Sequence, residues 1–208
     1  MGKDSNFEKC RNIGRIGENY FEDVEAPALF NNECRVLRVS DEKRFKPLGV
    51  DFIFFEKECS IDDVFESIMD NSEWKPYFYL AEVKTDEKIL ESRNMIYEYA
   101  SSSDKLGWSE TTLAHEIFYY GIDSEQNIVA GWRINPQKLK EWFHYVMMFL
   151  HGKEKSERIR SNRPASNGRL IFCVNIDMLV KDNIAKEITI KQGYKGFNAI
   201  QRFISANK

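Results

Sequence analysis

The sequence predicts an α/β fold in which helices flank a mixed central β-sheet. A helical pattern near the N-terminus, several strand-length apolar or alternating runs, and a mixture of helices and strands in the second half support this prediction. With 208 residues, of which 42% are hydrophobic, the chain can bury a substantial core. We therefore expect residues 1–208 to form a single domain.

The first predicted element is a helix over residues 7–24, where apolar residues recur at helical spacing. Pro27 is expected to end this helix soon afterwards. Gly14 and Gly17 lie inside it, although each glycine costs a helix roughly 1 kcal/mol relative to alanine. Their expected use is to let the helix backbone pack closely against a sheet or a site.

Three strands are predicted after this helix, in the segments 34–40, 48–56 and 76–84. The first alternates apolar and polar residues, and the second is strongly apolar after the turn residues Pro47 and Gly49. Between the second and third strands, residues 60–75 are acidic with some helical character. After the third strand, residues 89–102 are predicted to form a helix and 101–112 a loop.

The second half adds further strands and helices. Residues 113–122 are apolar enough for a strand, with a helix as the alternative. Pro136 suits the first turn of a helix. The remaining predicted elements are strands at 127–134 and 168–176, helices at 136–152 and 196–208, and a polar, basic loop at 152–168.

The charge balance limits the classes of partner. The formal net charge of −3 gives no global reason to expect a polyanion, so a nucleic-acid binder must concentrate basic residues locally or recruit metal ions. The four cysteines are scattered without a CxxC pair, which argues against a structural zinc site and for reduced thiols. The sequence shows no apolar signal region and no membrane-length apolar run. We expect a soluble, cytoplasmic protein with no membrane partner.

Two carboxylates occupy apolar strand segments. Asp51 lies within the run VDFIFF, where a carboxylate is costly to bury unless it is paired or holds a cation. Glu82 lies in YLAEVKTD, and in a strand Lys84 follows on the same face. Neighbouring strands could bring Asp51 and Glu82 together, and a divalent cation would relieve their repulsion. Oxygen ligands of this kind suit Mg²⁺ or Mn²⁺.

Lys84 and Glu18 complete this set of candidate residues. An ammonium beside such an ion can orient the attacking water or stabilise negative charge that develops on phosphorus. Glu18 lies one helical turn from Gly14, so it is expected to face inward as a third carboxylate. The alternative for Glu18 is an exposed position paired with Arg15 or Arg11.

These residues resemble the PD-(D/E)xK nuclease superfamily, which includes restriction endonucleases, Holliday-junction resolvases and RecB-like exonucleases. The matching motifs are Gly17-Glu18 in the helix, Gly49-Val50-Asp51 for the lone acid, and Glu82-Val83-Lys84 for the last element. The resemblance covers about residues 7–100 and implies a restriction endonuclease-like core. Val50 replaces the family's proline, and the long spacing between Asp51 and Glu82 implies an insertion at about 57–75. Lys84 is not followed by a clear glutamine–tyrosine motif of the RecB-like branch.

The resemblance also implies a mechanism and the residues that carry it. Asp51, Glu82 and the carbonyl of Val83 would bind Mg²⁺ or Mn²⁺, and Glu18 would contribute to a second ion or to a bound water. Lys84 would lie beside the attacking water during in-line hydrolysis of a phosphodiester. Most members of the family leave 5′-phosphate and 3′-hydroxyl ends.

The function predicted from these residues is a metal-dependent nuclease acting on DNA, of restriction or mobile-element type. One alternative is a non-catalytic nucleic-acid-binding or assembly protein that retains the fold, and another is a nuclease acting on RNA. Glu82 and Lys84 could also form an ordinary same-face salt bridge, and Asp51 could cap a turn or pair with Arg15 or Arg44. Cutting both strands of a duplex with one site per chain favours a homodimer.

Two further features have an ordinary and a functional interpretation. A basic cluster could be a solvated loop or a clamp on the nucleic-acid backbone, and its members are Lys153, Lys155, Arg158, Arg160 and Arg163. Trp108 could stack on a base, although anchoring of its loop is the favoured interpretation. The aromatic helix at 136–152 suits the core or a homodimer contact, and His144 within it suits a hydrogen-bonded structural role.

Overall fold

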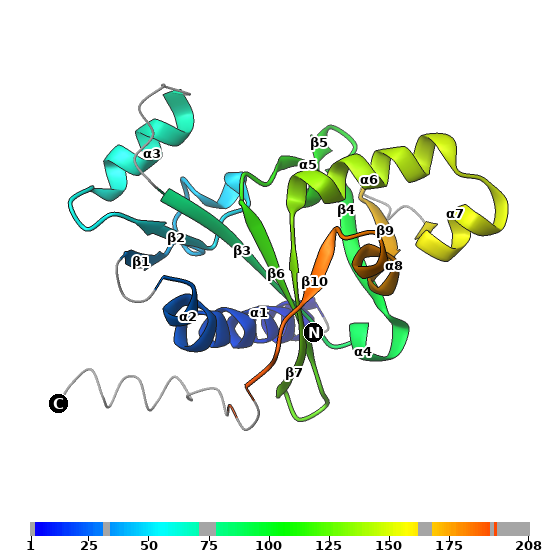
Figure 1. The fold of residues 1–208 in the computed structure, drawn as a ribbon, viewed down its shortest axis with the longest axis horizontal. Coiled ribbons are helices and arrows are strands. Elements are labelled where there is room, and N and C mark those ends of the chain that lie inside the picture. The colour runs from blue at the N-terminus through cyan, green and yellow to red at the C-terminus, as the bar shows by residue number, and fades with distance from the viewer. Residues whose placement is uncertain (1–2, 31–33, 71–77, 162–167, 192–193, 195–208) are drawn as a thin grey trace.

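The computed structural model describes residues 3–30, 34–70, 78–161, 168–191 and 194. Their backbone forms an α/β fold with two β-sheets and flanking helices (Figure 1). One sheet has six strands in the order β1-β2-β3-β6-β7-β10, and the other has four in the order β5-β4-β9-β8. The predicted mixed sheet flanked by helices is therefore confirmed at the level of fold class.

The six-stranded sheet is mixed because one of its neighbouring pairs is parallel. Its strands are β1 (Arg35–Arg38), β2 (Phe52–Phe55), β3 (Phe78–Asp86), β6 (Glu116–Ile122), β7 (Ile128–Ile134) and β10 (Ala185–Glu187). Strands β3 and β6 run parallel, and the other neighbours are antiparallel. The strands predicted at 34–40, 48–56, 76–84, 113–122 and 127–134 are confirmed, with ends that differ by a few residues.

The second sheet corrects the prediction for 89–102. Only the short α4 (Ile89–Ser92) is helical, and the rest of that segment is the strand β4 (Asn94–Ser102). Met95 and Tyr97 alternate along β4 as fully buried residues, which is the period of a strand. The other strands of this antiparallel sheet are β5 (Lys105–Leu106), β8 (Ile159–Ser161) and β9 (Leu170–Asn175). The strand predicted at 168–176 is confirmed as β9.

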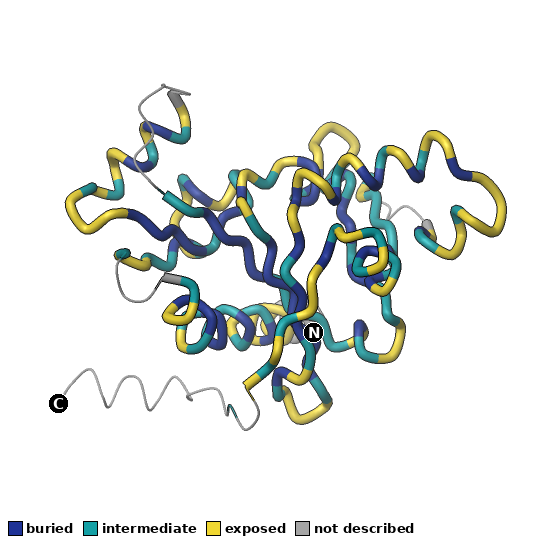
Figure 2. The backbone as a smooth tube through the Cα atoms, viewed as in Figure 1, coloured by how far each residue is buried: buried dark blue, intermediate teal, exposed yellow. Residues whose placement is uncertain are grey.

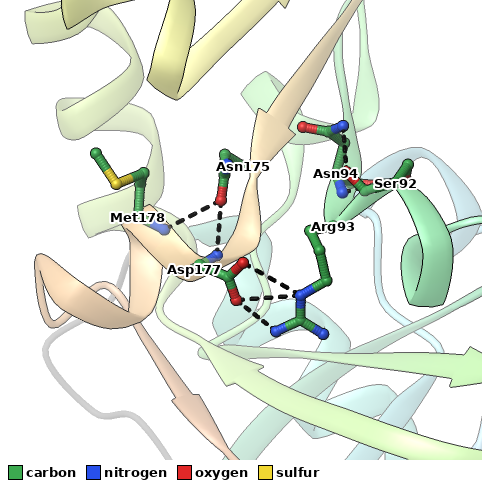
Figure 3. A network of polar contacts seen from close by, with 6 residues as sticks. All are labelled: Ser92, Arg93, Asn94, Asn175, Asp177 and Met178. Atoms are coloured by element: carbon green, nitrogen blue, oxygen red, sulfur yellow. Dashed lines mark hydrogen bonds and ion pairs between the residues drawn. The ribbon is translucent and has the colours of Figure 1, made fainter.

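A polar network closes the corner where β4 begins (Figure 3). Arg93, in the left-handed backbone region at φ 54°, donates through Nε to both Asp177 carboxylate oxygens at 3.2 Å. Asn175 caps helix α8 (Ile176–Lys181) by accepting from the Asp177 N–H at 2.9 Å. This network connects the start of β4 to the end of β9 and to α8, so it fixes how β4 enters the four-stranded sheet.

The N-terminal helical region is longer than predicted. Helix α1 (Lys3–Tyr20) continues through a π-helical segment, η1 (Phe21–Glu25), into α2 (Ala26–Phe30). The expectation that Pro27 ends the helix is wrong. Pro27 lies in the first turn of α2, directly after the change of register, and a first-turn position tolerates its missing N–H.

The remaining helices and short strands confirm some predicted elements and correct others. The predicted loop at 101–112 contains β5 and α5 (Trp108–Thr111), and the loop at 152–168 contains α7 (Gly152–Arg158) and β8. The helix predicted at 136–152 is confirmed as α6 (Pro136–Phe149), and the acidic stretch contains α3 (Ile61–Asp70). A 3₁₀ turn, η2 (Lys46–Leu48), precedes β2. The helix predicted at 196–208 lies outside the described residues.

Three hydrophobic clusters connect the layers, and Figure 2 shows the buried residues concentrated along the central strands. The largest joins both sheets to α6 and includes Tyr97, Tyr119 and Phe143. A second lies between α1 and one face of the six-stranded sheet, and a third lies between the opposite face and α3. None of the described helices has the length and apolarity needed to cross a bilayer. All four cysteines are free thiols.

The two helix glycines differ in what surrounds them. A Cβ on Gly17 would lie 2.0 Å from Thr85 Oγ1 and 3.3 Å from Val83 Cγ1, whereas one on Gly14 would have no heavy atom within 4 Å. Close packing against the sheet is therefore confirmed for Gly17 and wrong for Gly14. Gly17 lets α1 approach β3 at the residues that flank Lys84.

Alanine substitutions at Gly14 and Gly17 test this difference as a matched pair. We expect Gly14→Ala to raise the free energy of unfolding by roughly 0.5–1 kcal/mol through helix propensity. Gly17→Ala should lower it by about 1–3 kcal/mol, because the added methyl overpacks the contact with Thr85. Urea denaturation followed by circular dichroism measures both. Equal effects of the two substitutions would contradict the close contact of α1 with β3.

Candidate active site

Asp51 directly precedes β2 and lies against the backbone of β3. Gly49, in the left-handed region at φ 60°, turns the chain out of η2 and into this strand. The Asp51 N–H donates to the Ala81 carbonyl at 2.9 Å, and Asp51 Oδ2 accepts from the Val83 N–H at 2.8 Å. The carboxylate therefore lies beside the peptide bond that joins Glu82 to Val83.

The Val83 carbonyl faces the same side. The N–H and C=O of one strand residue point toward the same neighbouring strand. Because the Val83 N–H reaches Asp51, the Val83 carbonyl also points to the side where β2 begins. The carbonyl oxygen of Val83 and the carboxylate oxygens of Asp51 therefore lie near the same end of β2.

Glu82 and Lys84 lie on one face of β3, as predicted. Glu82 is only 3% exposed, and its Oε1 forms an ion pair with Lys84 Nζ. Its other oxygen, Oε2, is buried and has no hydrogen-bond partner among the described residues. An uncompensated carboxylate oxygen in this environment is unfavourable unless a cation or a donor approaches it.

Glu18 reaches the same region from α1. Its Oε2 accepts from Ser40 Oγ at 3.2 Å and forms an ion pair with Arg38. Burial raises the pKa of Glu18, the nearby Asp51 raises it further, and these effects outweigh the lowering effect of Arg38. The inward orientation of Glu18 is confirmed, and Arg38 is the partner in place of the Arg15 or Arg11 considered from the sequence.

Lys84 is surrounded by acidic groups and one aromatic ring. Burial lowers the pKa of the Lys84 amine, while Asp51, Glu18 and Glu98 act in the opposite direction. Its Nζ lies 5.0 Å from the ring centroid of Trp108, within the range of a cation–π contact. Trp108 also packs against the largest hydrophobic cluster, which supports its anchoring role.

Glu98 is a site residue that the sequence analysis missed. It lies on β4, is 9% exposed and accepts from Arg169 Nε at 2.7 Å. Its backbone N–H donates to Ser109 Oγ at 3.0 Å, which joins β4 to α5. The available signal was an acid within an alternating, aromatic-rich run, the same kind of signal that singled out Glu82. Because residues 89–102 were predicted to form a helix, Glu98 was not recognised as a buried acid on a strand.

The site therefore lies between two layers of the fold. On one side α1 packs on β3 and supplies Glu18, and on the other side β4 and α5 supply Glu98 and Trp108. Figure 1 shows α1 crossing below β3 and β6 in this view, with α5 above them. Four acidic side chains from separate elements thus act on Lys84, Glu82 as its ion-pair partner and the other three through their charge.

Arg44 and His144 each contact an acidic residue that is not part of the candidate site. Arg44 pairs with Asp62 at 2.6 Å. The predicted alternative, an ion pair between Arg44 and Asp51, is therefore wrong. His144 Nε2 lies 3.2 Å from Glu110 Oε1, and the Tyr97 hydroxyl donates to the same carboxylate. His144 therefore has the hydrogen-bonded structural role that was expected.

The donor set fits one hard divalent ion whose coordination is completed by water and substrate. No group of three or more His, Cys, Asp or Glu side chains within the described ranges is arranged to hold a metal ion. Asp51, Glu82 and the Val83 carbonyl nevertheless provide two carboxylates and one carbonyl, and Mg²⁺ is commonly bound by one or two carboxylates together with substrate phosphates. The buried, unpartnered Glu82 Oε2 supports this fit.

The basic cluster lies away from these carboxylates. Lys153, Lys155 and Arg158 are on α7, Arg160 is on β8, and Arg163 lies outside the described residues. In Figure 1, α7 is at the right-hand end of the molecule, whereas β1 and β2 are on the left. The structure does not bring the four described members of this cluster next to Asp51 and Glu82.

Contacts within the chain also occupy part of the cluster. Lys155 Nζ donates to the Met147 carbonyl at 3.0 Å, and Arg158 is 17% exposed with its Nε 3.8 Å from Asp182 Oδ2. Lys153 is highly exposed and lies 3.6 Å from Glu157, which is an ordinary surface pair. A clamp role for these residues stays a prediction, and it requires nucleic acid that extends well beyond the cleavage site.

Comparison with known proteins adds no relative. The chain matches no protein-family model, and neither the curated proteins nor the solved structures contain a match. The resemblance to the PD-(D/E)xK superfamily therefore rests on the three sequence motifs.

The position of Glu98 leads to a testable expectation. Glu98→Gln keeps the shape of the side chain but removes a negative charge near Lys84, so we expect cleavage to fall by about 10-fold, roughly 1.4 kcal/mol. Glu187→Gln on β10 is the matched control and should cleave as the wild type does. Steady-state kinetics on a duplex substrate checks this. Unchanged rates for Glu98→Gln would exclude Glu98 from the site.

Proposed function

We propose that this protein is a metal-dependent nuclease of the PD-(D/E)xK type that hydrolyses DNA phosphodiester bonds, as an endonuclease of restriction or mobile-element type. The observation that carries the proposal is the meeting of Asp51, Glu82 and Lys84 from adjacent strands, with one Glu82 oxygen buried and unpartnered. Glu18, from the preceding helix, lies close enough to influence both Asp51 and Lys84.

The fold supports the proposal through the order of its elements. Helix α1 with Glu18 comes first, β1 and β2 follow with Asp51 at the start of β2, and β3 carries Glu82 and Lys84. This is the order that the resemblance implies for a restriction endonuclease-like core. The sheet is mixed and covered by helices, which is compatible with that core.

The chemistry follows from the donors at the site. Asp51, Glu82 and the Val83 carbonyl would hold Mg²⁺ or Mn²⁺, which supplies Lewis-acid stabilisation of the negative charge on the scissile phosphate. Lys84 donates to the attacking water or to a phosphoryl oxygen, and its partly buried position strengthens that interaction. The water oxygen bonds to phosphorus as the bond to the 3′ oxygen breaks. The attacking water releases one proton to solvent, and the 3′ oxygen leaves and takes one proton from solvent, which would give 5′-phosphate and 3′-hydroxyl ends.

Cleavage assays test the proposal directly. Supercoiled plasmid and labelled single-stranded, duplex and branched DNA are incubated with Mg²⁺, Mn²⁺ or EDTA. We expect metal-dependent cutting by the wild type, loss of cutting in Lys84→Ala and Asp51→Ala, and normal cutting in Asp62→Ala, whose side chain is exposed. Cutting that persists in EDTA or in both site variants would contradict the proposal. Labelled RNA in the same assay tests the RNA alternative.

A second candidate function has one observation in its favour. Glu82 pairs with Lys84 and Glu18 pairs with Arg38, so in this arrangement cations of the chain itself balance two of the site's carboxylates. A non-catalytic nucleic-acid-binding or assembly protein would use these pairs only for structure. Tight DNA binding in EDTA, without cutting on any substrate in Mg²⁺ or Mn²⁺, would favour this candidate.

A homodimer is the assembly that suits double-strand cutting by one site per chain. Helix α6 exposes Tyr145, Met148 and Phe149 on its surface, and the rings of Tyr145 and Phe149 lie 5.5 Å apart. Such an apolar face suits contact with a second copy. Sedimentation velocity should show a dimer for the wild type and a monomer for Met148→Glu. A wild type that stays monomeric with duplex DNA bound would contradict this assembly.

A further inference from the structure

Arg38 is held rigidly beside the candidate active site. Its Nε lies 3.3 Å from Ser40 Oγ, one terminal nitrogen donates to Asn19 Oδ1 at 2.9 Å, and the other pairs with Glu18. The side chain is 24% exposed, and each of its three guanidinium nitrogens has a partner. A planar guanidinium with all its nitrogens engaged is fixed in place, so Arg38 does not swing freely toward a substrate.

The strand that carries Arg38 pairs with the segment that follows Asp51. Arg38 ends β1 and lies opposite Phe52, the residue after Asp51. The neighbouring Val39 N–H donates to the Asp51 carbonyl at 2.7 Å. Backbone pairing therefore joins the strand of Arg38 to the segment of Asp51, and Glu18, which pairs with Arg38, lies close enough to Asp51 to feel its charge.

One carboxylate oxygen of Glu18 is committed to contacts within the chain. Its Oε2 accepts from both Arg38 and Ser40, and its side chain is 16% exposed. A guanidinium stays charged throughout the working pH range of proteins. A divalent ion bound to Glu18 would therefore stand beside a permanent positive charge, which repels it.

We propose that Arg38 takes the place of a second divalent cation, so that the site binds a single ion at Asp51, Glu82 and the Val83 carbonyl. Glu18 then acts as a positioning residue that holds Arg38, and it is not a metal ligand. This inference rests on the proposed nuclease function and refines it. It replaces the second-ion role that the resemblance implies for Glu18 with a charge built into the chain.

Counting bound Mn²⁺ by electron paramagnetic resonance tests the inference without any cleavage. We expect one ion per chain for the wild type and for Glu18→Gln, with less than a threefold change in Kd between them. Arg38→Met removes the charge and frees Glu18, so a second, weaker ion should bind. Arg44→Met is the matched control, because Arg44 pairs with Asp62, and it should still bind one ion.

The outcomes separate this inference from the proposed function. Two ions in the wild type and one in Glu18→Gln would make Glu18 a ligand, which overturns the inference but leaves a metal-dependent nuclease. No bound ion in any of these proteins would overturn both. If Arg38→Met does not fold, as judged by circular dichroism, the count for Glu18→Gln decides: one ion supports the inference, and the loss of an ion overturns it.

Discussion

Lys84→Met should lower kcat for DNA cleavage by about 10³-fold while changing KM little. Methionine keeps an unbranched side chain but removes the ammonium that pairs with Glu82 and lies over Trp108. In the proposed mechanism that ammonium acts on the attacking water and on the charge that develops at phosphorus. Rapid-quench measurements on a labelled duplex, with Mg²⁺ in excess, give kcat and KM separately.

The same variant should also change how the protein responds to metal. Glu82 is almost fully buried, and without Lys84 both of its oxygens lack a partner, which destabilises the fold in EDTA. Mn²⁺ should therefore raise the melting temperature of Lys84→Met more than that of the wild type. Lys105→Met, at an exposed position on β5, should behave as the wild type in both experiments. Unimpaired cleavage by Lys84→Met would remove Lys84 from the mechanism.

Asp51→Asn should abolish metal binding while it preserves the fold. The asparagine oxygen can still accept from the Val83 N–H, so the start of β2 stays in place, whereas the charge that attracts the ion is lost. We expect cleavage to fall by about 10³-fold or more. Stabilisation by Mn²⁺, which for a bound ion reaches about 2.7 kcal/mol at a concentration 100 times Kd, should disappear.

Thermal melting with and without Mn²⁺ measures this effect independently of catalysis. Asp62→Asn is the matched control, because Asp62 is an exposed acid on α3 that pairs with Arg44. It should keep both cleavage and stabilisation by Mn²⁺. Asp51→Asn with the full Mn²⁺ stabilisation of the wild type would show that the ion binds elsewhere.

The strands that build the site carry strong local signals, and this explains why the sequence predicts them. Asp51 and Glu82 are acids within apolar runs, and β2 and β3 are neighbours along the chain, so their pairing follows from simple connection rules. The alternation of YLAEVKTD also places Glu82 and Lys84 on one face without knowledge of the rest of the fold.

The residues that complete the site depend on contacts between distant segments. Glu98 lies on β4, which pairs with β9 from a distant part of the chain, and no local pattern reveals that pairing. Arg38 is an ordinary arginine in an alternating strand until α1 places Glu18 opposite it. The basic residues within 153–160 are the opposite case. Their composition suggests a nucleic-acid clamp, but the fold places them away from the candidate metal ligands.

Anomalous X-ray diffraction from crystals soaked in Mn²⁺ is the most direct test of the candidate metal site. We expect one peak bounded by Asp51, Glu82 and the carbonyl of Val83, with oxygen distances of about 2.0–2.6 Å. The Glu82 side chain should then turn its free oxygen toward the ion. At saturating Mn²⁺, the absence of a peak beside Asp51 and Glu82, with the Glu82 carboxylate still paired only with Lys84, would contradict the account.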